Sequence, residues 1–336
     1  MSQTDKTAVV LVNLGTPDKA EKGAVRRYLK EFLSDQRVVE GKCVKRLFWL
    51  SVLNGIILNV RPGKVAKAYA SIWEDDSPMR KILDKQVAGL HLLLQQKHGE
   101  HAPDVFSAMT YGKPGLTPRL QKLQESGYHK ILLVPMYPQY SATTTAPIYD
   151  QVAKFQLKQR EVLDIRIVNS YYSHPEYIAA LADQVQNFRT EHGTPDKLIL
   201  SYHGIPKEYF DKGDPYPKQC HETSELLAAK LGLADTEWMT TFQSRFGPKE
   251  WMQPYTDKTL ESLPEKGVKS LQIACPAFSA DCLETLEEIA IENQEVFMEA
   301  GGESYEYIPA LNAQDSFIEL LATLVREQAG DWVGVR

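Results

Sequence analysis

The chain has 336 residues, a length that suits two domains better than one. Hydrophobic residues make up 43% of it and charged residues 24%, which is ordinary for a globular protein that builds its own core. The formal net charge of -6 leaves no basic excess to neutralise phosphates, so nucleic acid is excluded as the main partner.

Strand and helix patterns alternate along the chain. In chain order they predict a strand at 8–15, helices at 24–35 and 87–98, a strand at 104–112, a helix at 119–127, a strand at 130–138, a helix at 180–188, a strand at 197–204, a helix at 224–232, a strand at 270–278, and helices at 283–301 and 314–328. This alternation is typical of parallel sheets joined by crossover helices, an α/β fold.

The two halves of the chain resemble each other. "LVNLGTP" (11–17) and "LSYHGIP" (200–206) both end an apolar run in x-Gly-x-Pro, and the segments at 125–141 and 265–281 repeat a second pattern. Either the matches are chance, or the chain forms two similar Rossmann-like lobes with a cleft between them, where ligands bind beyond the carboxyl ends of the strands.

We therefore expect three parts. An N-terminal α/β lobe spans 1–170, a C-terminal α/β lobe spans 171–312, and the remainder, 313–336, forms a C-terminal helix that packs back on the first lobe.

One segment is unusually apolar. Residues 47–58, "LFWLSVLNGIIL", are flanked by basic residues and are too short to span a membrane. They are either a partly buried core helix or an exposed apolar lip for a greasy ligand or a membrane surface.

The cysteines indicate the compartment. The chain has four, at 43, 220, 275 and 282, and no CxxC pair, which disfavours a structural zinc site, a thioredoxin-type site and a disulfide framework. The first residues do not read as a signal peptide. We expect a reduced, cytoplasmic protein.

Several common active-site motifs are missing from the sequence. It contains no G-x-G-x-x-G, no Walker A loop, no H-E-x-x-H and no G-x-S-x-G. Nucleotide binding, zincin and α/β-hydrolase chemistry by these routes are therefore not predicted.

His203 is the first candidate for chemistry. It lies at the carboxyl end of a predicted strand, beside Gly204, which permits close approach of another group. A neutral imidazole there can accept a proton near pH 7 or bind a borderline metal, although a histidine is more often structural.

The second candidate is an acidic stripe. On an α-helix, Asp281, Glu284, Glu288, Glu292 and Glu295 would share one face. Such a stripe is often a solvated helix face, and acids in a first turn also favour the helix dipole. The functional alternative is a track of oxygen ligands for a divalent cation.

Aromatic loops form a third group. The segments 134–145 and 242–257 are rich in aromatic residues, prolines and hydroxyls. They either simply pack or, with 47–58, line a pocket for a flat, apolar ligand.

Seven segments in order resemble the ferrochelatases, which insert ferrous iron into a porphyrin at the end of haem synthesis, and most closely those of Gram-negative bacteria. They are "LVNLGTP" (11–17), "FLSDQRVVE" (32–40), "PQYSATT" (138–144), "SYHGIP" (201–206), "GDPYPKQC" (213–220), "FQSRFGPKEW" (242–251) and "CPAFSADCLETLEEI" (275–289). The resemblance implies two α/β lobes with a porphyrin cleft between them.

The resemblance also implies site residues. His203 and Glu284 would be the paired catalytic residues that handle metal and protons, with Asp281 and Glu288 as further metal ligands. Porphyrin contacts would come from Arg61, Tyr69, Ser77, Tyr111, Tyr137 and Trp251. Fe²⁺ would be a substrate, with no permanently bound cofactor, and the apolar lip at 47–58 would touch membrane in some members.

The chain departs from the family pattern in places. Thr110 stands where many members have an arginine, and Cys282 where some have a histidine. The scattered cysteines disfavour the [2Fe–2S] cluster of some relatives.

The reaction predicts a division of roles. Strain that distorts the macrocycle would expose the nitrogen lone pairs, His203 would remove pyrrole protons, and Glu284 would hold or pass the ion. The opposite assignment, with His203 as first metal ligand, stays open. So do two rivals: a cobalt chelatase for a more carboxylated substrate, and a haem or metal carrier without turnover.

Overall fold

The computed structural model describes residues 6–41 and 43–332. Its contacts divide the chain into two compact units. The first lies within Met1–Tyr137, Ala142–Asn169 and Ala313–Arg336, and the second comprises Pro138–Ser141 and Ser170–Asn312. Each unit is an α/β body with its own sheet and its own core.

The two sheets share one topology. Each has four parallel strands, in the orders β2-β1-β3-β4 and β6-β5-β7-β8, so β5 corresponds to β1 and β7 to β3. The strands are β1 (Lys6–Thr16), β2 (Asp104–Gly112), β3 (Tyr128–Pro135), β4 (Asp164–Ile167), β5 (Lys197–His203), β6 (Trp238–Gln243), β7 (Ser270–Ala274) and β8 (Ser304–Tyr307). The prediction of two similar parallel-sheet lobes is confirmed.

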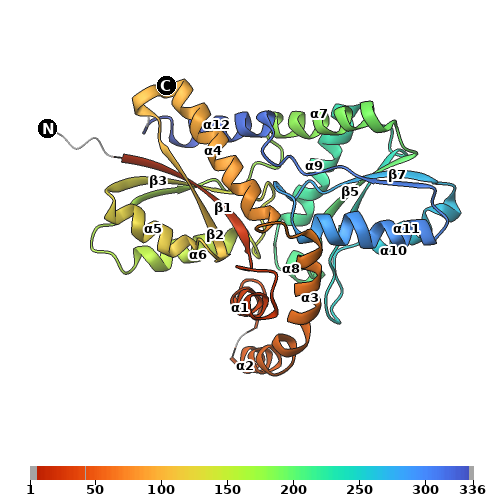
Figure 1. Cartoon of the computed structure of the whole chain (residues 1–336), viewed down its shortest axis with the longest axis horizontal. Helices are drawn as coiled ribbons and strands as arrows, with labels where there is room; N and C mark the ends of the chain where they lie inside the picture. Colours follow the sequence, from red (N-terminus) through yellow and green to blue (C-terminus); the bar gives the residue numbers. More distant parts are fainter. Residues whose placement is uncertain (1–5, 42, 333–336) are drawn as a thin grey trace. The chain divides into compact units, whose positions relative to one another are not determined.

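Helices cover both faces of the first sheet. In Figure 1, one face carries α4 (Pro78–His98) and α12 (Asp315–Ala329), and the other carries α5 (Leu116–Glu125) and α6 (Thr145–Gln156). Because both faces are covered, the middle of the central strand β1 is an apolar run, and its residues 8–12 have no exposed surface.

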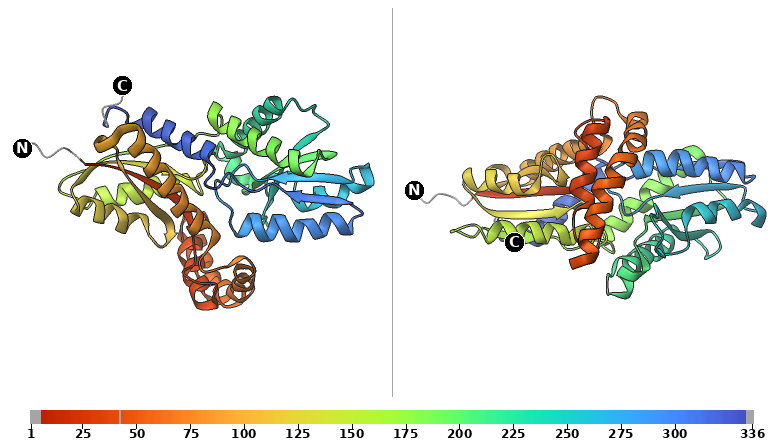
Figure 2. Two further views of the ribbon diagram at one scale, coloured as in Figure 1. Left: turned by 45° about the horizontal axis from the view of Figure 1, so that its top comes forward. Right: turned by 90° about the horizontal axis from the view of Figure 1, so that it is seen from below.

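The second sheet is covered in the same way. One face carries α7 (Pro175–His192) and α9 (Tyr216–Leu231), and the other carries α10 (Thr256–Ser262) and α11 (Asn293–Glu299), as Figures 1 and 2 show. A short helix, α8 (Lys207–Asp211), follows β5. Ile199, Ile273, Ile289 and Phe297 form the centre of the core between the sheet and the α10/α11 layer.

Helix α12 belongs to the first unit although it comes last in the chain. It packs along α4, where the Cβ of an alanine at Gly89 would lie only 3.3 Å from the Ile318 side chain. After α12, Asp331 pairs with Arg166 of β4 at 2.5 Å.

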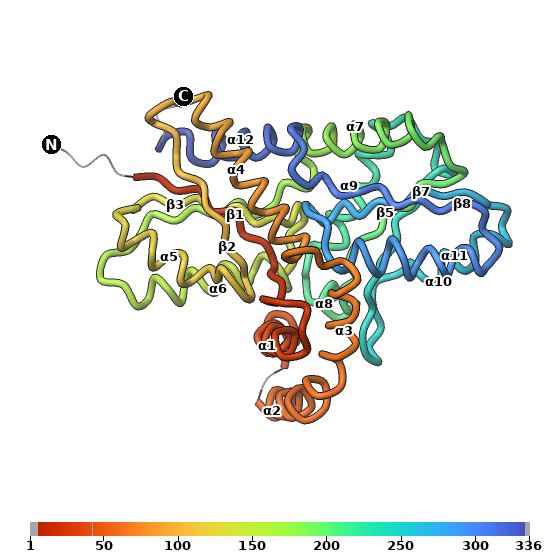
Figure 3. The backbone as a smooth tube through the Cα atoms, viewed as in Figure 1, coloured from red at the N-terminus to blue at the C-terminus, as the bar shows by residue number. Residues whose placement is uncertain are grey.

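Three consecutive helices extend from the first sheet. They are α1 (Lys22–Leu33), α2 (Cys43–Val52) and α3 (Leu58–Ile72), with a π-helical turn (Leu53–Ile57) between α2 and α3, and the tube in Figure 3 follows this path. Leu53 and Leu58 are buried against α1, and Trp49 Nε1 donates to Leu33 O at 2.9 Å. Only the inner side of this helical segment is therefore anchored.

The outer side of that segment is apolar and exposed. The exposed fractions are 78% for Val44, 68% for Leu47, 70% for Phe48, 59% for Ile56 and 71% for Val60. By length and composition alone, Cys43–Ile72 would suffice to cross a membrane, and little of its apolar stretch is buried. The geometry therefore favours the exposed-lip interpretation of residues 47–58 over the core-helix interpretation.

Several elements differ from the sequence-based expectation. Helix α6 was not predicted, because the Thr-rich segment around Thr143–Thr145 reads as a loop. Strand β6 is not predicted, and its last two residues fall in the segment 242–257 that is expected to be a loop. The short edge strands β4 and β8 carry too few apolar residues to stand out. The expected helix at 283–301 is helical, but its first half is a π-helix, Glu284–Glu292.

Candidate active site

His203 ends β5, and its ring orientation is fixed by its own neighbour. Nδ1 lies 2.7 Å from the carbonyl oxygen of Gly204. A carbonyl can only accept a hydrogen bond, so Nδ1 carries the proton. In the neutral ring, Nε2 therefore keeps its lone pair, free to accept a proton or to bind a metal.

Gly204 is required by the approach of β6. Its N–H donates to Gln243 O at 2.8 Å, and an added Cβ would lie 2.9 Å from the same oxygen and 3.2 Å from Cε3 of Trp251. The close approach predicted from the sequence is therefore made by the protein's own backbone and by an indole ring. Gly15 has the equivalent place in the first unit, where a Cβ would meet Tyr111 O.

Glu284 begins the π-helix Glu284–Glu292. Glu288 and Glu292 follow at intervals of four residues, so the three carboxylates stay near one side of the helix. Wide helical turns of this kind are rare and often occur at functional sites. The acidic stripe expected from the sequence is present from Glu284 onward.

Asp281 does not belong to that stripe. It lies before the helix, where the sequence-based placement on an α-helix is wrong. Its carboxylate accepts hydrogen bonds from Tyr307 (2.5 Å), Asn312 (2.7 Å), Thr285 (3.1 Å) and the Ala310 N–H (3.3 Å). Asp281 thus joins the start of the π-helix to the segment after β8.

Glu288 is an acidic residue in a strongly perturbed environment. Burial raises its pKa from 4.5 to about 7, and Glu284 and Glu292 add to the rise, while a hydrogen bond from Ser244 Oγ (2.5 Å) opposes it. Beside it lies a cavity of about 230 Å³, lined in part by Ser244, Arg245, Asp257, Glu288, Glu292 and Asn293. Glu288 can therefore exchange a proton near neutral pH.

The buried cysteines do not supply metal ligands. Burial raises the pKa of the Cys275 and Cys282 thiols well above the usual range, so neither provides a thiolate. Within residues 6–41 and 43–332, no three or more His, Cys, Asp or Glu side chains are grouped so that they could hold a metal ion. A transient ion would rely on pairs of side chains.

Three of the expected porphyrin contacts follow α2. Arg61 is exposed on α3, whereas Tyr69 is buried and meets Trp73 edge to face at 5.9 Å. Ser77 is buried, and its Oγ accepts a hydrogen bond from Thr16 Oγ1 at 2.8 Å.

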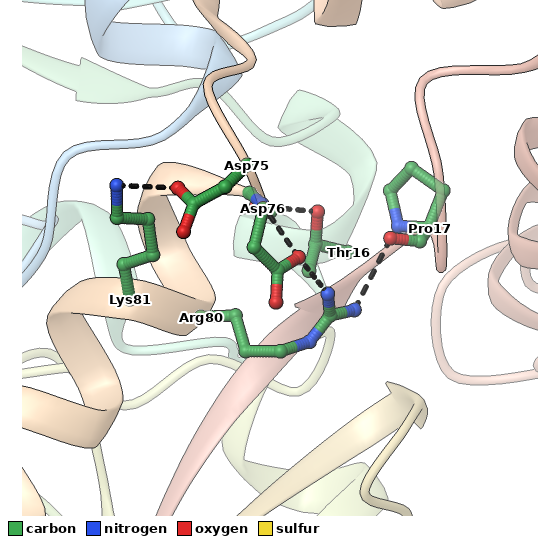
Figure 4. A network of polar contacts seen from close by, with 7 residues as sticks. Thr16, Pro17, Asp75, Asp76, Arg80 and Lys81 are labelled. Atoms are coloured by element: carbon green, nitrogen blue, oxygen red, sulfur yellow. Dashed lines mark hydrogen bonds and ion pairs between the residues drawn. The ribbon is translucent and has the colours of Figure 1, made fainter.

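The loop before α4 holds Ser77 in place. Figure 4 shows Arg80 reaching both Asp76 and the carbonyl oxygen of Pro17, the latter at 3.1 Å. Lys81 pairs with Asp75 at 2.7 Å. These contacts tie the loop to the carboxyl end of β1.

Tyr111 and Tyr137 lie at the carboxyl ends of β2 and β3. Tyr111 OH donates to Asp35 at 2.9 Å, and burial, reinforced by Asp35, raises the pKa of Tyr111. Tyr137 OH lies 3.4 Å from Thr110 Oγ1, and burial raises its pKa too. Thr110, which replaces the arginine of many family members, is thus a buried neighbour of Tyr137.

Trp251 lies in the loop after β6. Its ring centre is 6.5 Å from that of His203, and its Nε1 donates to Phe246 O at 2.9 Å. Of the expected site residues, the structure brings Trp251 close to His203 within the second unit.

Sequence reasoning missed two residues of this region. Gln243 ends the buried strand β6 as His203 ends β5, and Ser244 follows it, but the sequence pattern does not predict β6. Gln243 hydrogen-bonds to Glu284 O at 3.2 Å and Ser244 to Glu288. The same strand-end rule that selected His203 would have selected them.

Comparisons with known proteins agree on one family. The ferrochelatase family model matches residues 6–329. The ferrochelatase of Psychrobacter arcticus is 51% identical over 329 residues, 98% of this chain and 96% of that protein. The ferrochelatase of Acinetobacter baumannii is 50% identical over 324 residues, 96% and 95% of the two chains.

Solved structures show the same fold at low identity. SirB from Bacillus subtilis, solved with Fe³⁺, has a TM-score of 0.56 and 13% identity, and covers 98% of both chains. CbiX, described as the terminal enzyme of sirohaem biosynthesis in denitrifying bacteria, has a TM-score of 0.53 and 11% identity over 96% of this chain and 98% of that one.

The buried Glu288 makes stability depend on pH. Below about pH 4.5 the carboxyl is protonated in both the folded and the unfolded chain, so its ionisation does not lower the free energy of unfolding. Between about pH 4.5 and 7 the unfolded chain loses the proton while the folded chain keeps it, and above about pH 7 the full destabilisation, about 3 kcal/mol, is present. We expect Glu288→Gln to raise the free energy of unfolding more at pH 8 than at pH 5.5, measured by urea denaturation. An equal effect at both values would contradict the assignment.

Proposed function

This chain belongs to the ferrochelatase family, and we propose how it carries out the family's reaction, the insertion of ferrous iron into protoporphyrin IX in haem synthesis. The enzyme is a metal chelatase, a lyase whose substrates are a porphyrin and Fe²⁺. We assign the reacting groups to His203 and Glu284. The observation that carries the assignment of His203 is the hydrogen bond of its Nδ1 to Gly204 O, which leaves the Nε2 lone pair for chemistry.

His203 acts as the base. Metalation must remove two protons from pyrrole nitrogens while four nitrogen lone pairs close around the ion. Nε2 has its lone pair because Nδ1 is bound to Gly204 O, so the imidazole can take up each proton and pass it on before the next.

Glu284 and Glu288 handle the ion and the released protons. An imidazole nitrogen with carboxylate oxygens suits Fe²⁺ and also accepts Zn²⁺ or Co²⁺. Glu288, whose pKa is about 7, can carry a proton away from Glu284 along the π-helix. Asp281 contributes by fixing the start of that helix, since its oxygens already accept four hydrogen bonds.

The porphyrin contacts are assigned to six residues that hold the ring and distort it. Distortion turns the nitrogen lone pairs out of the ring plane and so lowers the barrier to metalation. Trp251 provides aromatic surface, Tyr137, Tyr111 and Tyr69 support the pocket from buried positions, and the exposed Arg61 offers a donor to the porphyrin's carboxylates. The buried Ser77 supports the pocket wall through its contact with Thr16. The six are Arg61, Tyr69, Ser77, Tyr111, Tyr137 and Trp251.

We propose that the enzyme works without a resident cofactor. In support, Cys220, Cys275 and Cys282 are buried, and burial raises the pKa of their thiols well above the usual range, whereas an iron–sulfur cluster needs thiolate ligands. Nucleic acid is not proposed as a partner, because the net charge is -6.

We propose that the enzyme is cytoplasmic and peripheral to the membrane. In this proposal the apolar lip at 47–58 rests on the membrane surface. Leu47, Phe48 and Ile56 are more than half exposed, and the exposed Lys64 and Lys67 lie on the following helix. Apolar side chains with neighbouring lysines suit the interface of an anionic bilayer.

Turnover tests the assignment of the reacting pair. We expect the wild-type enzyme to convert protoporphyrin IX and Fe²⁺ to haem under anaerobic conditions, and His203→Ala and Glu284→Gln each to lower kcat at least 100-fold. His192→Ala, on α7, is the matched control and should retain activity, since His192 contacts Glu306 rather than the site.

Three other outcomes would change the account. If His203→Ala loses metal affinity while proton release is unaffected, His203 is the first metal ligand and not the base. If only a more carboxylated porphyrin is metalated, the substrate is wrong. If porphyrin binds but metalation is not accelerated, the protein is a carrier.

Vesicle binding tests the lip. We expect the wild-type protein to sediment with vesicles of anionic phospholipid, and Leu47→Asp combined with Phe48→Asp to reduce the bound fraction at least tenfold. Leu157→Asp combined with Val162→Asp is the control, because these side chains are 87% and 66% exposed outside the lip. Equal loss in both double variants, or no binding by the wild type, would contradict the proposal.

A further inference from the structure

Gln243 is a buried amide at the end of β6, with 3% of its surface exposed. Its Oε1 accepts from Ser201 Oγ at 2.8 Å and from Cys275 Sγ at 3.5 Å. Its Nε2 donates to the carbonyl oxygen of Glu284 at 3.2 Å. One side chain therefore contacts β5, the residue after β7, and the first residue of the π-helix.

Two of these three elements carry the reacting groups, β5 with His203 and the π-helix with Glu284. Ser201 precedes His203 by two residues on the same strand. The backbone carbonyl of Glu284 itself accepts the hydrogen bond from Nε2 of Gln243. The backbone of Gln243 adds a fourth link, since its carbonyl oxygen accepts from Gly204 N at 2.8 Å. Gln243 therefore contacts both Glu284 and the end of the strand that carries His203.

The chemistry of the partners fixes the amide orientation. The Glu284 carbonyl can only accept, so it must face the NH₂ group, and the oxygen then faces the hydroxyl of Ser201 and the thiol of Cys275. Because burial leaves no water to replace these bonds, losing the donor would leave the start of the π-helix free to shift.

We propose that Gln243 is a positioning residue for the reaction: its side chain and its backbone together set Glu284 relative to His203. This rests on the proposed function, in which those two residues handle the ion and the protons. Gln243 itself does not touch substrate. Its effect should appear in metal handling and not in porphyrin affinity.

Gln272 offers a matched control in the same sheet. It is 1% exposed on β7, and its Nε2 also donates to a backbone carbonyl, Gly193 O, at 3.0 Å. Gly193 precedes β5, at the amino end of the strands, whereas Gln243 lies at their carboxyl ends. Loss of either amide should cost similar stability.

The test compares Gln243→Leu with Gln272→Leu in the full-length protein. We expect Gln243→Leu to lower kcat/KM for the metal ion at least 20-fold, with the KM for protoporphyrin unchanged within about twofold. Gln272→Leu should stay within threefold of wild type, while thermal unfolding shows similar losses for both. Gln243→Glu keeps the accepting oxygen but removes the NH₂ donor, so it should show the same loss of kcat/KM for the metal ion. This variant replaces Gln243→Leu in the test if the leucine variant does not fold.

A second readout needs no turnover. We expect wild-type protein without porphyrin to bind Zn²⁺ at a site lost in Glu284→Gln, and Gln243→Leu to weaken that binding at least tenfold while Gln272→Leu leaves it unchanged. Unchanged Zn²⁺ binding in Gln243→Leu and Gln243→Glu, or Zn²⁺ binding that does not depend on Glu284, would overturn the positioning role. If the wild type binds Zn²⁺ through Glu284 but does not metalate porphyrin, that result would instead count against the proposed function alone.

Discussion

The backbone contact between the ends of β5 and β6 is the constraint on which the reacting site depends. Gly204 N donates to Gln243 O at 2.8 Å, and no Cβ fits at Gly204. Because the chain turns there without a side chain, the Gly204 carbonyl can face the imidazole of His203 at 2.7 Å. The close contact between the backbones of Gly204 and Gln243 thus determines which nitrogen of His203 carries the proton.

The π-helix Glu284–Glu292 depends on the same sheet end. Gln243 binds the carbonyl of Glu284, Ser244 binds the carboxyl of Glu288, and Asp281 anchors the residues before the helix. Carboxylates at intervals of four would repel one another on a solvated helix. Here burial raises the pKa of Glu288 to about 7, so the carboxyl is partly protonated at neutral pH and the repulsion is reduced by a proton that the reaction itself can move.

Much of this arrangement could be predicted from the sequence. The apolar run at 104–112 matches β2 residue for residue, and the strand-end position of His203 follows from "KLILSYHG". The π-helix could not be predicted, because acids at intervals of four fit an α-helix equally well. Gln243 was missed since "WMTTFQ" is polar in its centre, and its partners come from segments more than 30 residues away.

The most direct test of the central claim is the protonation state of His203. In protein labelled with ¹⁵N-histidine at pH 8, the account predicts that the His203 signals, assigned by their loss in His203→Gln, show a protonated Nδ1 and an unprotonated Nε2. That result would establish Nε2 as the nitrogen that meets the substrate. A proton on Nε2 would mean that Gly204 does not set the tautomer, and the assignment of His203 as base would have to be abandoned.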